Sequence, residues 1–282
     1  MLNVGLIGCG NIAETYFRSQ EYFNNINFIS CTDINEEAAK KCADQYNIKI
    51  QSVDDLLSNP DIDVILNLTV PQAHHEVTKK ILLAGKHSYC EKPLSISFEQ
   101  GKELVEIAKE KNIYLGNAPD TFLGAGGQLS RQLLDVGEIG DVQLGNFIFA
   151  FPGVETFHHN PDSWYKKGGG PIIDMGPYFF TMLVHLLGPA KNVQSRGIKV
   201  KENRIIDAGP RKDEKIIVEV PTSYTFNVEF RSGALIQGFI SFDVINHQRN
   251  HMELYGTKGS MIVPDPNMFG GPVTISKEIG SE

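Results

Sequence analysis

The sequence predicts an α/β protein of two domains, a doubly wound parallel sheet followed by an α+β domain with a large, mostly antiparallel open sheet. Up to about residue 117, short apolar runs alternate with stretches of helical periodicity, which is typical of a parallel sheet covered by helices. After about residue 190, β-rich runs follow one another directly. A chain of 282 residues is long enough for two domains, which we expect at 1–121 and 122–282.

A glycine turn follows the first expected strand, Leu2–Ile7. It reads Gly8-Cys9-Gly10-Asn11-Ile12-Ala13 and leads into a helical stretch, so strand, G-x-G-x-x-A turn and helix occur in order. This order is typical of dinucleotide binding, because the glycines allow a tight turn and a close approach of the pyrophosphate to the helix N-terminus. A glycine turn in an unrelated α/β protein is the alternative.

An acidic residue follows at the position expected for ribose binding. The second expected strand, 28–32, ends in Asp33, about 20 residues beyond the glycine turn. A carboxylate accepts hydrogen bonds from a ribose 2′-hydroxyl and repels a 2′-phosphate, and no arginine follows Asp33 directly. The sequence thus favours NAD, with NADP as the alternative cofactor. Asp33 could also cap the helix expected from Asn35 onward.

The other elements of the first domain continue the alternation. Further helices are expected at 36–46, 53–57, 71–84 and 97–112, and further strands at 48–50, 63–68, 87–90 and 113–115. Ligands of doubly wound sheets bind at the carboxyl ends of the strands. Three segments therefore share one rim with the glycine turn: Thr69-Val70-Pro71, Glu91-Lys92-Pro93 and Asn117-Ala118-Pro119.

Lys92 is the most informative residue of this rim. It directly follows a strand and lies between an acid and a proline that fixes the backbone. A lysine beside a nicotinamide could polarise a carbonyl or hold an alkoxide. The alternative is a surface lysine paired with Glu91, which is the more frequent case for an arbitrary lysine.

A second glycine loop begins the longest expected helix. Residues 168–170 are glycines, Pro171 suits a first helical position, and the apolar run to Leu187 predicts a buried helix. Asp174 and Tyr178 are spaced i, i+4 and so project from one face near the N-terminus of that helix. A carboxylate and a phenol can exchange protons with a ligand. A capped core helix without chemistry is the alternative.

The rest of the second domain is predicted from β-rich runs. A helix at 127–136 and a strand from 142 are expected before the long helix, and strands at 192–200, 216–220, 222–230, 234–244, 251–255 and 260–263 after it. Arg231-Ser232-Gly233 and Thr257-Lys258-Gly259 indicate hairpin turns. Together these runs predict a mostly antiparallel sheet with helices on one face.

Composition and charge argue against several classes of function. The net charge of −8 and the lack of a basic cluster argue against nucleic-acid binding. No apolar run is long enough to span a membrane, and the N-terminus lacks the features of a signal peptide. Cys9, Cys31, Cys42 and Cys90 show no metal-ligand spacing. We expect reduced, buried thiols, no metal and a cytoplasmic location.

The stretch Gly85-Lys86-His87-Ser88-Tyr89-Cys90-Glu91-Lys92-Pro93-Leu94 closely resembles the AGKHVxxEKPL signature of the glucose–fructose oxidoreductase, inositol dehydrogenase and rhizopine catabolism (Gfo/Idh/MocA) family. The GxGxxA turn and the GGGxxxDxGxY stretch also match, in the right order. The resemblance extends to about Leu187. It implies an N-terminal Rossmann domain, a C-terminal domain with a large open sheet, and NAD(P)-dependent oxidation or reduction of sugars, polyols or related compounds.

The resemblance also implies the residues of the cofactor site. The contacts to pyrophosphate and ribose would be Gly8, Gly10, Asn11, Ile12, Ala13 and Asp33. The contacts near the cofactor on the other rim segments would be Thr69, Pro71, His74, Glu91, Lys92 and Asn117.

Lys92, Asp174 and Tyr178 are the catalytic residues that the resemblance implies, and they would also contact substrate. Tyr178 stands where many members of the family carry histidine and some carry tyrosine. The segment 157–165 resembles a family stretch that enters the substrate pocket, so His158 or His159, together with Trp164, is expected to contact substrate.

These residues imply reversible hydride transfer between C4 of a nicotinamide and a carbinol carbon. Tyr178 would exchange the hydroxyl proton, and Asp174 would orient the substrate or Tyr178. The charge of Lys92 would make the phenol easier to deprotonate and would stabilise an alkoxide. Two other functions fit the same motifs: a nucleotide-binding regulator or sensor without catalysis, and an enzyme that recycles a bound cofactor between two sugars.

The resemblance further implies a homodimer or homotetramer formed through the open face of the second sheet. Alternating apolar residues such as Ile236, Phe239 and Ile240 are compatible with this interface or with core packing. Family members usually continue beyond the position of Gly280-Ser281-Glu282. The second domain is therefore expected to be shortened at its C-terminus.

Overall fold

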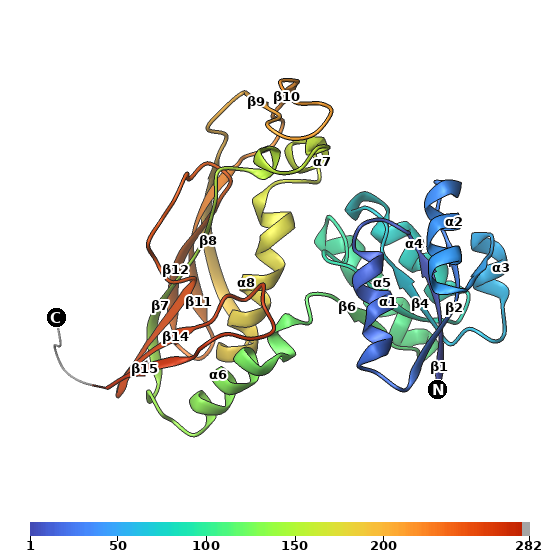
Figure 1. Cartoon of the computed structure of the whole chain (residues 1–282). Helices are drawn as coiled ribbons and strands as arrows, with labels where there is room; N and C mark the ends of the chain where they lie inside the picture. Colours follow the sequence, from blue (N-terminus) through green and yellow to red (C-terminus); the bar gives the residue numbers. More distant parts are fainter. Residues whose placement is uncertain (278–282) are drawn as a thin grey trace. The chain divides into compact units, whose positions relative to one another are not determined.

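The computed structural model describes residues 1–277 and divides into two compact units, Met1–Ala118 and Pro119–Glu282 (Figure 1). Each unit is built around a large sheet of its own. The boundary expected after residue 121 would fall inside a short 3-10 helix of the second unit, η2 (Thr121–Leu123). The expected short C-terminus, Gly280-Ser281-Glu282, lies outside the described residues.

The first unit contains a six-stranded parallel sheet with the strand order β3-β2-β1-β4-β5-β6. Its strands are β1 (Leu2–Ile7), β2 (Ile26–Thr32), β3 (Lys49–Ile50), β4 (Val64–Asn67), β5 (His87–Cys90) and β6 (Leu115–Asn117). The strand order reverses between β1 and β4, which is the point where doubly wound sheets bind ligands. The expected Rossmann fold is therefore confirmed.

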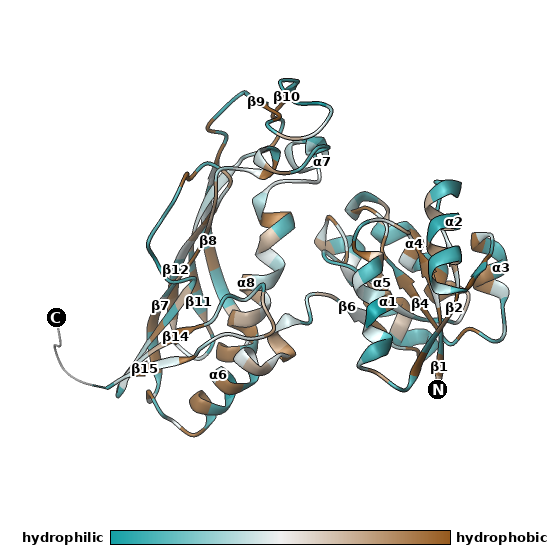
Figure 2. Ribbon diagram, in the orientation of Figure 1, coloured by the Kyte–Doolittle hydropathy of each residue, from teal (hydrophilic) through white to brown (hydrophobic). Residues whose placement is uncertain are grey.

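Helices cover both faces of this sheet because side chains alternate along each strand. The helices are α1 (Ala13–Arg18) with the 3-10 turn η1 (Ser19–Glu21), α2 (Glu36–Tyr46), α3 (Val53–Ser58), α4 (Pro71–Leu83) and α5 (Phe98–Lys111). On β1, Leu6 packs with α1 and α2, whereas Ile7 packs with α3 and α4. Figure 2 shows the central strands as the apolar layer between the helices.

The last strand of the first unit begins later than expected. The sequence predicts a strand at 113–115, but β6 spans Leu115–Asn117. The reason is local: Asn112 ends α5 in the left-handed conformation, and the Ile113 N–H then donates to the Ala108 carbonyl. Ile113 therefore belongs to the end of the helix.

The second unit contains a seven-stranded sheet with the order β15-β14-β13-β7-β12-β11-β8. Its strands are β7 (Val142–Ala150), β8 (Ala190–Ile198), β11 (Ser223–Phe230), β12 (Leu235–Ser241), β13 (Met252–Gly256), β14 (Gly259–Val263) and β15 (Thr274–Ser276). Within the described residues, β12 and β7 pair parallel and every other neighbouring pair is antiparallel. The expectation of a large, mostly antiparallel sheet is thus confirmed.

Two helices pack on one face of this sheet, α6 (Ala125–Asp135) and α8 (Pro171–Leu187) (Figure 1). The core beneath α8 is aromatic: Phe147 of β7 packs against Phe179 of α8 and Phe226 of β11, with ring centroids 5.8 and 5.9 Å apart. Ile236 and Ile240 are fully buried in the same core. Ile236 and Ile240 therefore do not lie on the open face of the sheet. Phe239, the third of these residues, is half-exposed.

A separate two-stranded ribbon was not predicted. The sequence predicts one strand at 216–220 of the large sheet, but β10 (Lys215–Ile217) pairs only with β9 (Asn203–Ile205), within the described residues. The ribbon lies beside α7 (Asp162–Tyr165), as Figure 1 shows. Arg204 in β9 carries a charge in a polar stretch, so local pattern did not indicate a strand here.

The expectations from the sequence for cysteines, metal ligands and helix lengths can each be compared with the structure. All four cysteines are free thiols, but Cys42 is half-buried rather than buried as expected. Burial raises the pKa of the Cys90 thiol to about 12. Among residues 1–277, no three His, Cys, Asp or Glu side chains are grouped to hold a metal ion. Every helix in that range is too short or too polar to span a bilayer.

Gly8 is required by the backbone of the turn after β1. It has φ +104°, and a Cβ atom there would lie 2.6 Å from the Leu68 carbonyl oxygen. Its N–H donates to the Thr32 carbonyl at 2.9 Å. By contrast, a Cβ on Gly10 would meet nothing within 4 Å. Of these two glycines, only Gly8 is therefore required by the conformation of the turn.

We predict that Gly8→Ala lowers the free energy of unfolding by about 1–3 kcal/mol, because the residue combines a strained φ with a backbone clash. Gly10→Ala, the matched control two residues away, should unfold within about 0.5 kcal/mol of the wild type. Urea denaturation followed by circular dichroism measures both. Equal stabilities for the two variants would contradict the prediction.

Candidate active site

The turn between β1 and α1 leaves its helix N-terminus available to a ligand. Gly10 is exposed and bordered by open space, and Ala13 is completely buried, so the helix packs closely on the sheet. No side chain caps α1. The Ala13 N–H donates to the Gly10 carbonyl at 3.0 Å, and the uncapped end of the helix is suited to an anionic group such as a pyrophosphate. Asn11 and Ile12 lie at this exposed corner.

Asp33 directs its carboxylate to the same turn. Its Oδ2 accepts a hydrogen bond from the Cys9 N–H at 2.6 Å, and its Oδ1 accepts one from the Asn35 N–H at 2.7 Å. The cap of α2 is Asn35, whose side chain accepts from the N–H groups of Glu37 and Ala38. The helix-cap alternative for Asp33 is thus wrong. Each carboxylate oxygen keeps a further lone pair for a ribose hydroxyl.

A buried amide organises the rim after β4. Asn67 is completely buried and makes four hydrogen bonds. Its Nδ2 donates to the His74 carbonyl and the Thr78 Oγ1, at 3.0 and 2.9 Å. Its Oδ1 accepts from the N–H and the Oγ1 of Thr69, at 3.2 and 2.7 Å. All donors and acceptors of this amide are used, so the conformation of the loop before Pro71 is fixed.

His74 connects this loop to the turn that contains Lys92. The ring is buried, with Nε2 2.8 Å from the Thr69 carbonyl and Nδ1 2.6 Å from the Pro93 carbonyl. The Lys92–Pro93 peptide bond is cis. The ring thus contacts backbone of both segments and points into the protein. The resemblance implies a cofactor contact for His74, whereas its geometry is that of a support for two rim segments.

Glu91 supports the same turn from the other side. Its Oε1 accepts from the Tyr16 hydroxyl at 2.7 Å, and its Oε2 accepts from the Lys92 N–H at 2.8 Å. The Asn117 side chain donates to the carbonyls of Cys90 and Glu91, at 2.9 and 3.2 Å. Lys92 itself is half-buried. The carboxylate therefore braces the turn and α1, and both of its oxygens already have protein donors.

In the second unit, α8 holds Asp174 and Tyr178 one turn apart. Gly168 and Gly170 have φ values of +88° and +96°, and the Asp174 N–H donates to the Gly170 carbonyl at 3.1 Å. Both side chains are half-buried, and Tyr178 packs against the aromatic core. The helix spans Pro171–Leu187, as predicted.

The segment 157–165 forms a surface of stacked rings. The rings of His158 and His159 are stacked with centroids 5.0 Å apart, and His158 lies 4.9 Å from Trp164. Burial, together with the neighbouring His159, lowers the pKa of His158 below its usual value. The His158 Nδ1 accepts from the Asn160 N–H at 3.0 Å. The neutral ring therefore carries its proton on Nε2 and can donate from there.

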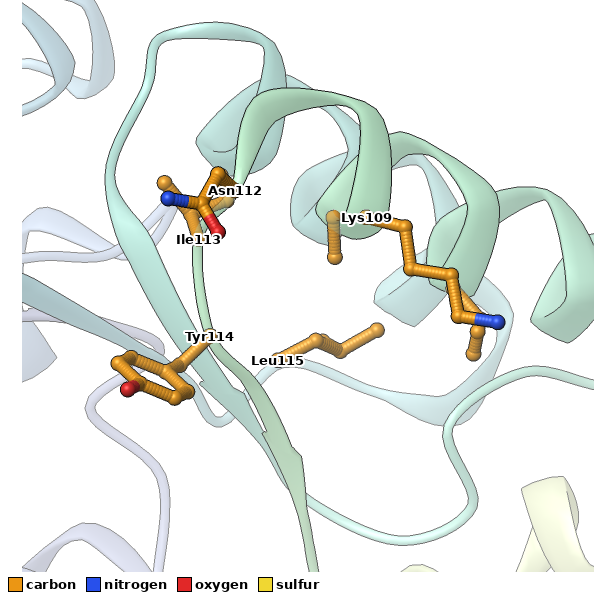
Figure 3. A pocket seen from close by; sticks show the side chains of 7 residues that line it. Lys109, Asn112, Ile113, Tyr114 and Leu115 are labelled. Atoms are coloured by element: carbon orange, nitrogen blue, oxygen red, sulfur yellow. The ribbon is translucent and has the colours of Figure 1, made fainter.

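One pocket lies outside this arrangement (Figure 3). It is found where α5 ends and β6 begins, at the opposite end of β6 from Asn117. Its lining residues are Val105, Ala108, Lys109, Asn112, Ile113, Tyr114 and Leu115. Because it lies at the amino end of β6 and not at the carboxyl-end rim, we do not include it in the candidate site.

Two residues of the cofactor rim were missed from the sequence. Asn67 ends β4 directly before the predicted segment, and a polar residue at a buried strand end could have indicated it. Tyr16 lies on the first helix, and nothing in the local pattern connects it with Glu91, 75 positions away.

The described residues fit a dinucleotide. An uncapped helix N-terminus, open space at Gly10 and a carboxylate with free lone pairs occur at one corner of the sheet. The helix N-terminus suits the phosphates of an adenosine diphosphate, and the open space at Gly10 lets them come close to the backbone. The carboxylate suits the ribose hydroxyls.

Comparison with known proteins agrees with this geometry. Residues 2–118 match the family model described as oxidoreductase family, NAD-binding Rossmann fold. Residues 128–262 match the GFO/IDH/MocA C-terminal domain. The chain is 25% identical to 1,5-anhydro-D-fructose reductase of Ensifer adhaerens over 92% of its own length and 74% of that enzyme.

Two further relatives show the same pattern. Inositol 2-dehydrogenase of Rhizobium meliloti is 23% identical over 76% of this chain, which spans 64% of that enzyme. A solved structure of levoglucosan dehydrogenase with NADH and L-sorbose superposes with a TM-score of 0.81 at 24% identity, over 93% of this chain and 72% of that one. With its two domain matches in order, this chain belongs to the Gfo/Idh/MocA family of oxidoreductases, and its first unit is an NAD-binding Rossmann domain.

Proposed function

We propose that this protein is an NAD-dependent dehydrogenase or reductase that transfers a hydride between the cofactor and a CH–OH carbon of a sugar, polyol or related compound. The main support for the proposal is that hydrogen bonds hold the turn with Lys92 against the segment that follows β4. The Glu91 N–H donates to the Asn67 carbonyl at 2.9 Å, and the His74 ring contacts both rim segments. A rigidly held lysine beside a dinucleotide site is suited to act on a substrate oxygen.

Each of the proposed site residues has its own role in the hydride transfer. The bound cofactor supplies the acceptor or donor of the hydride. Lys92 donates a hydrogen bond to the substrate oxygen and stabilises the negative charge that develops on it. Tyr178 takes up or returns the hydroxyl proton, and Asp174, one turn away on the same helix, orients the substrate hydroxyl or the phenol. His158 and Trp164 contact the ring of the substrate.

The class of substrate is supported by the relatives. Two of them are named for 1,5-anhydro-D-fructose and for inositol, and a structural neighbour contains L-sorbose. All three compounds carry several hydroxyl groups. The stacked rings of the segment 157–165 and the donor at His158 Nε2 suit such a compound, because it offers both C–H groups and hydroxyls.

The preference for NAD over NADP rests on Asp33 and Ile34. The Asp33 carboxylate points to the glycine turn, and Ile34 beside it is fully exposed. A 2′-phosphate would meet the negative charge of Asp33, and Ile34 beside it offers no positive charge. NADP is the less favoured cofactor.

A homodimer or homotetramer and a cytoplasmic location complete the proposal. Leu144 and Leu235 are 54% and 48% exposed on neighbouring strands of the open sheet face, which supports a contact with a second copy. Four free thiols support a reducing compartment.

We predict that the chain oxidises or reduces at least one member of a panel of sugars and cyclic polyols with NAD⁺ or NADH, followed by absorbance of the reduced cofactor. Lys92→Ala should lower kcat by about 100-fold or more, because it removes the charge that stabilises the developing oxyanion. The control is Lys80→Ala, an exposed lysine of α4. NADH binding without turnover of any compound would favour the regulator, and cofactor that survives purification would favour the recycling enzyme.

We predict that His74→Asn lowers kcat by about 10- to 100-fold, since the shorter side chain cannot contact both carbonyls and the Lys92 turn loses its support. Dissociation constants for NADH should change by less than about threefold. The matched control is His75→Asn: His75 is also buried on α4, but its Nε2 contacts Glu103 of α5 at 2.7 Å. If both variants lose the same activity at equal stability, the support of the Lys92 turn by His74 does not determine kcat.

We predict that Ile34→Arg tightens NADPH binding by about tenfold, because a guanidinium forms charge-assisted hydrogen bonds with a 2′-phosphate. The gain should shrink as salt is raised from about 0.05 to 0.5 M. Calorimetric titration with NADH and NADPH measures both affinities, with Ile34→Gln as the uncharged control. A wild type that already prefers NADPH would show that Asp33 does not select the cofactor.

A further inference from the structure

The ribbon β9–β10 with its connecting loop, residues 203–217, packs against the stacked rings of the segment 157–165. We propose that this ribbon is a specificity element, which holds the rings of His158, His159 and Trp164 in position for the substrate. The inference rests on the proposed function and extends it to residues that contact no substrate themselves.

The base of the ribbon is fixed by a buried guanidinium. The side chain of Arg204 is 1% exposed, and its Nη1 donates to the Pro152 carbonyl at 2.9 Å and to Glu155 Oε1 at 2.5 Å. Its Nη2 donates to the Phe242 carbonyl at 2.9 Å and pairs with Asp243. One cation thus contacts residues just before the ring segment and residues just after β12.

Tyr165 joins the other end of the ring segment to this cluster. Its hydroxyl donates to Glu155 and accepts from the Val154 N–H, and the Arg204 guanidinium lies 5.1 Å from its ring centre. Burial and the bond to Glu155 raise the pKa of the Tyr165 phenol far above its usual value, so it stays protonated as a donor. Trp164 is therefore attached to a residue that cannot move independently of the ribbon.

The tip of the ribbon contacts the middle of the ring segment. Arg211 pairs with both carboxylate oxygens of Asp162, at 2.5 and 3.3 Å, and its Nη1 donates to Asn160 Oδ1 at 3.3 Å. Gly209 has φ +74° and packs on His159, where a Cβ would lie 2.4 Å from the histidine Cβ. The arginine pair holds the pKa of Asp162 below its usual range.

Stability alone does not account for the buried cluster. Burying a guanidinium and two carboxylates costs desolvation energy that their attraction seldom exceeds, and packed apolar residues of equal volume would hold the ribbon at least as firmly. What the charges provide is one defined geometry, because a planar guanidinium donates its hydrogen bonds only along fixed directions. A defined geometry is what a ring surface needs in order to select among substrates that differ in one hydroxyl.

The held surface suits a cyclic, hydroxyl-rich ligand. Flat imidazole and indole faces can cover the C–H groups of such a ring, while the neutral His158 donates from Nε2 to a hydroxyl. The ligand class that we infer is therefore a pyranose or a cyclic polyol that binds through one C–H face and a hydroxyl.

The test weakens the tip and leaves the buried base intact. Arg211→Gln should raise KM for the substrate identified in the panel by about tenfold or more, with kcat within about twofold and the NADH dissociation constant unchanged. Asp162→Asn should raise KM in the same direction, and the double variant should be no worse than Arg211→Gln, since that substitution already removes the pair with Asp162. Lys212→Gln, an exposed neighbour, is the control and should match the wild type.

NMR titration of His158 gives a second reading that does not depend on activity. Loosening the tip admits water, so the pKa of His158 should rise toward its ordinary value in both variants. The two substitutions change the local charge in opposite directions, so a charge effect alone would shift this pKa up in Arg211→Gln and down in Asp162→Asn. A rise in both therefore reports loosening.

Unchanged KM and unchanged His158 titration in Arg211→Gln and Asp162→Asn would overturn the specificity role of the ribbon in an active enzyme. Opposite shifts of the His158 pKa would also overturn it. If the wild type turns over no sugar or polyol, the proposed function fails first, and the ribbon's role in specificity fails with it.

Discussion

The four hydrogen bonds of the Asn67 side chain are the constraint on which the cofactor rim depends. The amide is buried at the end of β4, and each of its donors and acceptors is used by the loop and helix that follow. An unsatisfied polar group there would cost about 1–3 kcal/mol, so the loop has one favourable conformation. That conformation directs the Thr69 carbonyl to His74, and His74 in turn reaches the Pro93 carbonyl. The position of Lys92 therefore depends on an amide at the end of β4, the strand next to β1 and its glycine turn.

Much of this architecture could be predicted, because local signals mark its limits. Helix α8 begins at Pro171 after three glycines and ends at Leu187 before Gly188, as expected. Strand β5 spans His87–Cys90, also as expected, since a proline turn follows it closely. The order of strands and helices predicted the parallel sheet, and therefore placed the glycine turn, the Thr69 segment and the Lys92 turn on one rim.

The features that could not be predicted from the sequence depend on contacts between residues far apart in the chain. Arg204 lies in a polar stretch and would be taken for a surface residue, but its carboxylate partners, Glu155 and Asp243, are 49 and 39 positions away. The direction in which a side chain points also cannot be predicted from the sequence pattern. The pattern identified His74, but only the structure shows that both ring nitrogens contact backbone carbonyls. The spacing of Ile236 and Ile240 places both on one face of a strand but does not say which face. The structure shows that they face the aromatic core beneath α8.

The ribbon is inserted between two strands that are already neighbours. Strands β8 and β11 pair along their whole length, with Ile198 opposite Ser223, and residues 203–217 lie in the connection between them. The ribbon contributes Ile206 and Ile216 to a small apolar cluster that also contains Val154, Tyr165 and Phe242. Insertions, deletions or exchanges in this connection therefore leave the register of the seven-stranded sheet intact. With the ribbon as the proposed specificity element, changes in one hairpin connection can alter ligand choice while the seven-stranded sheet keeps its strand order and register.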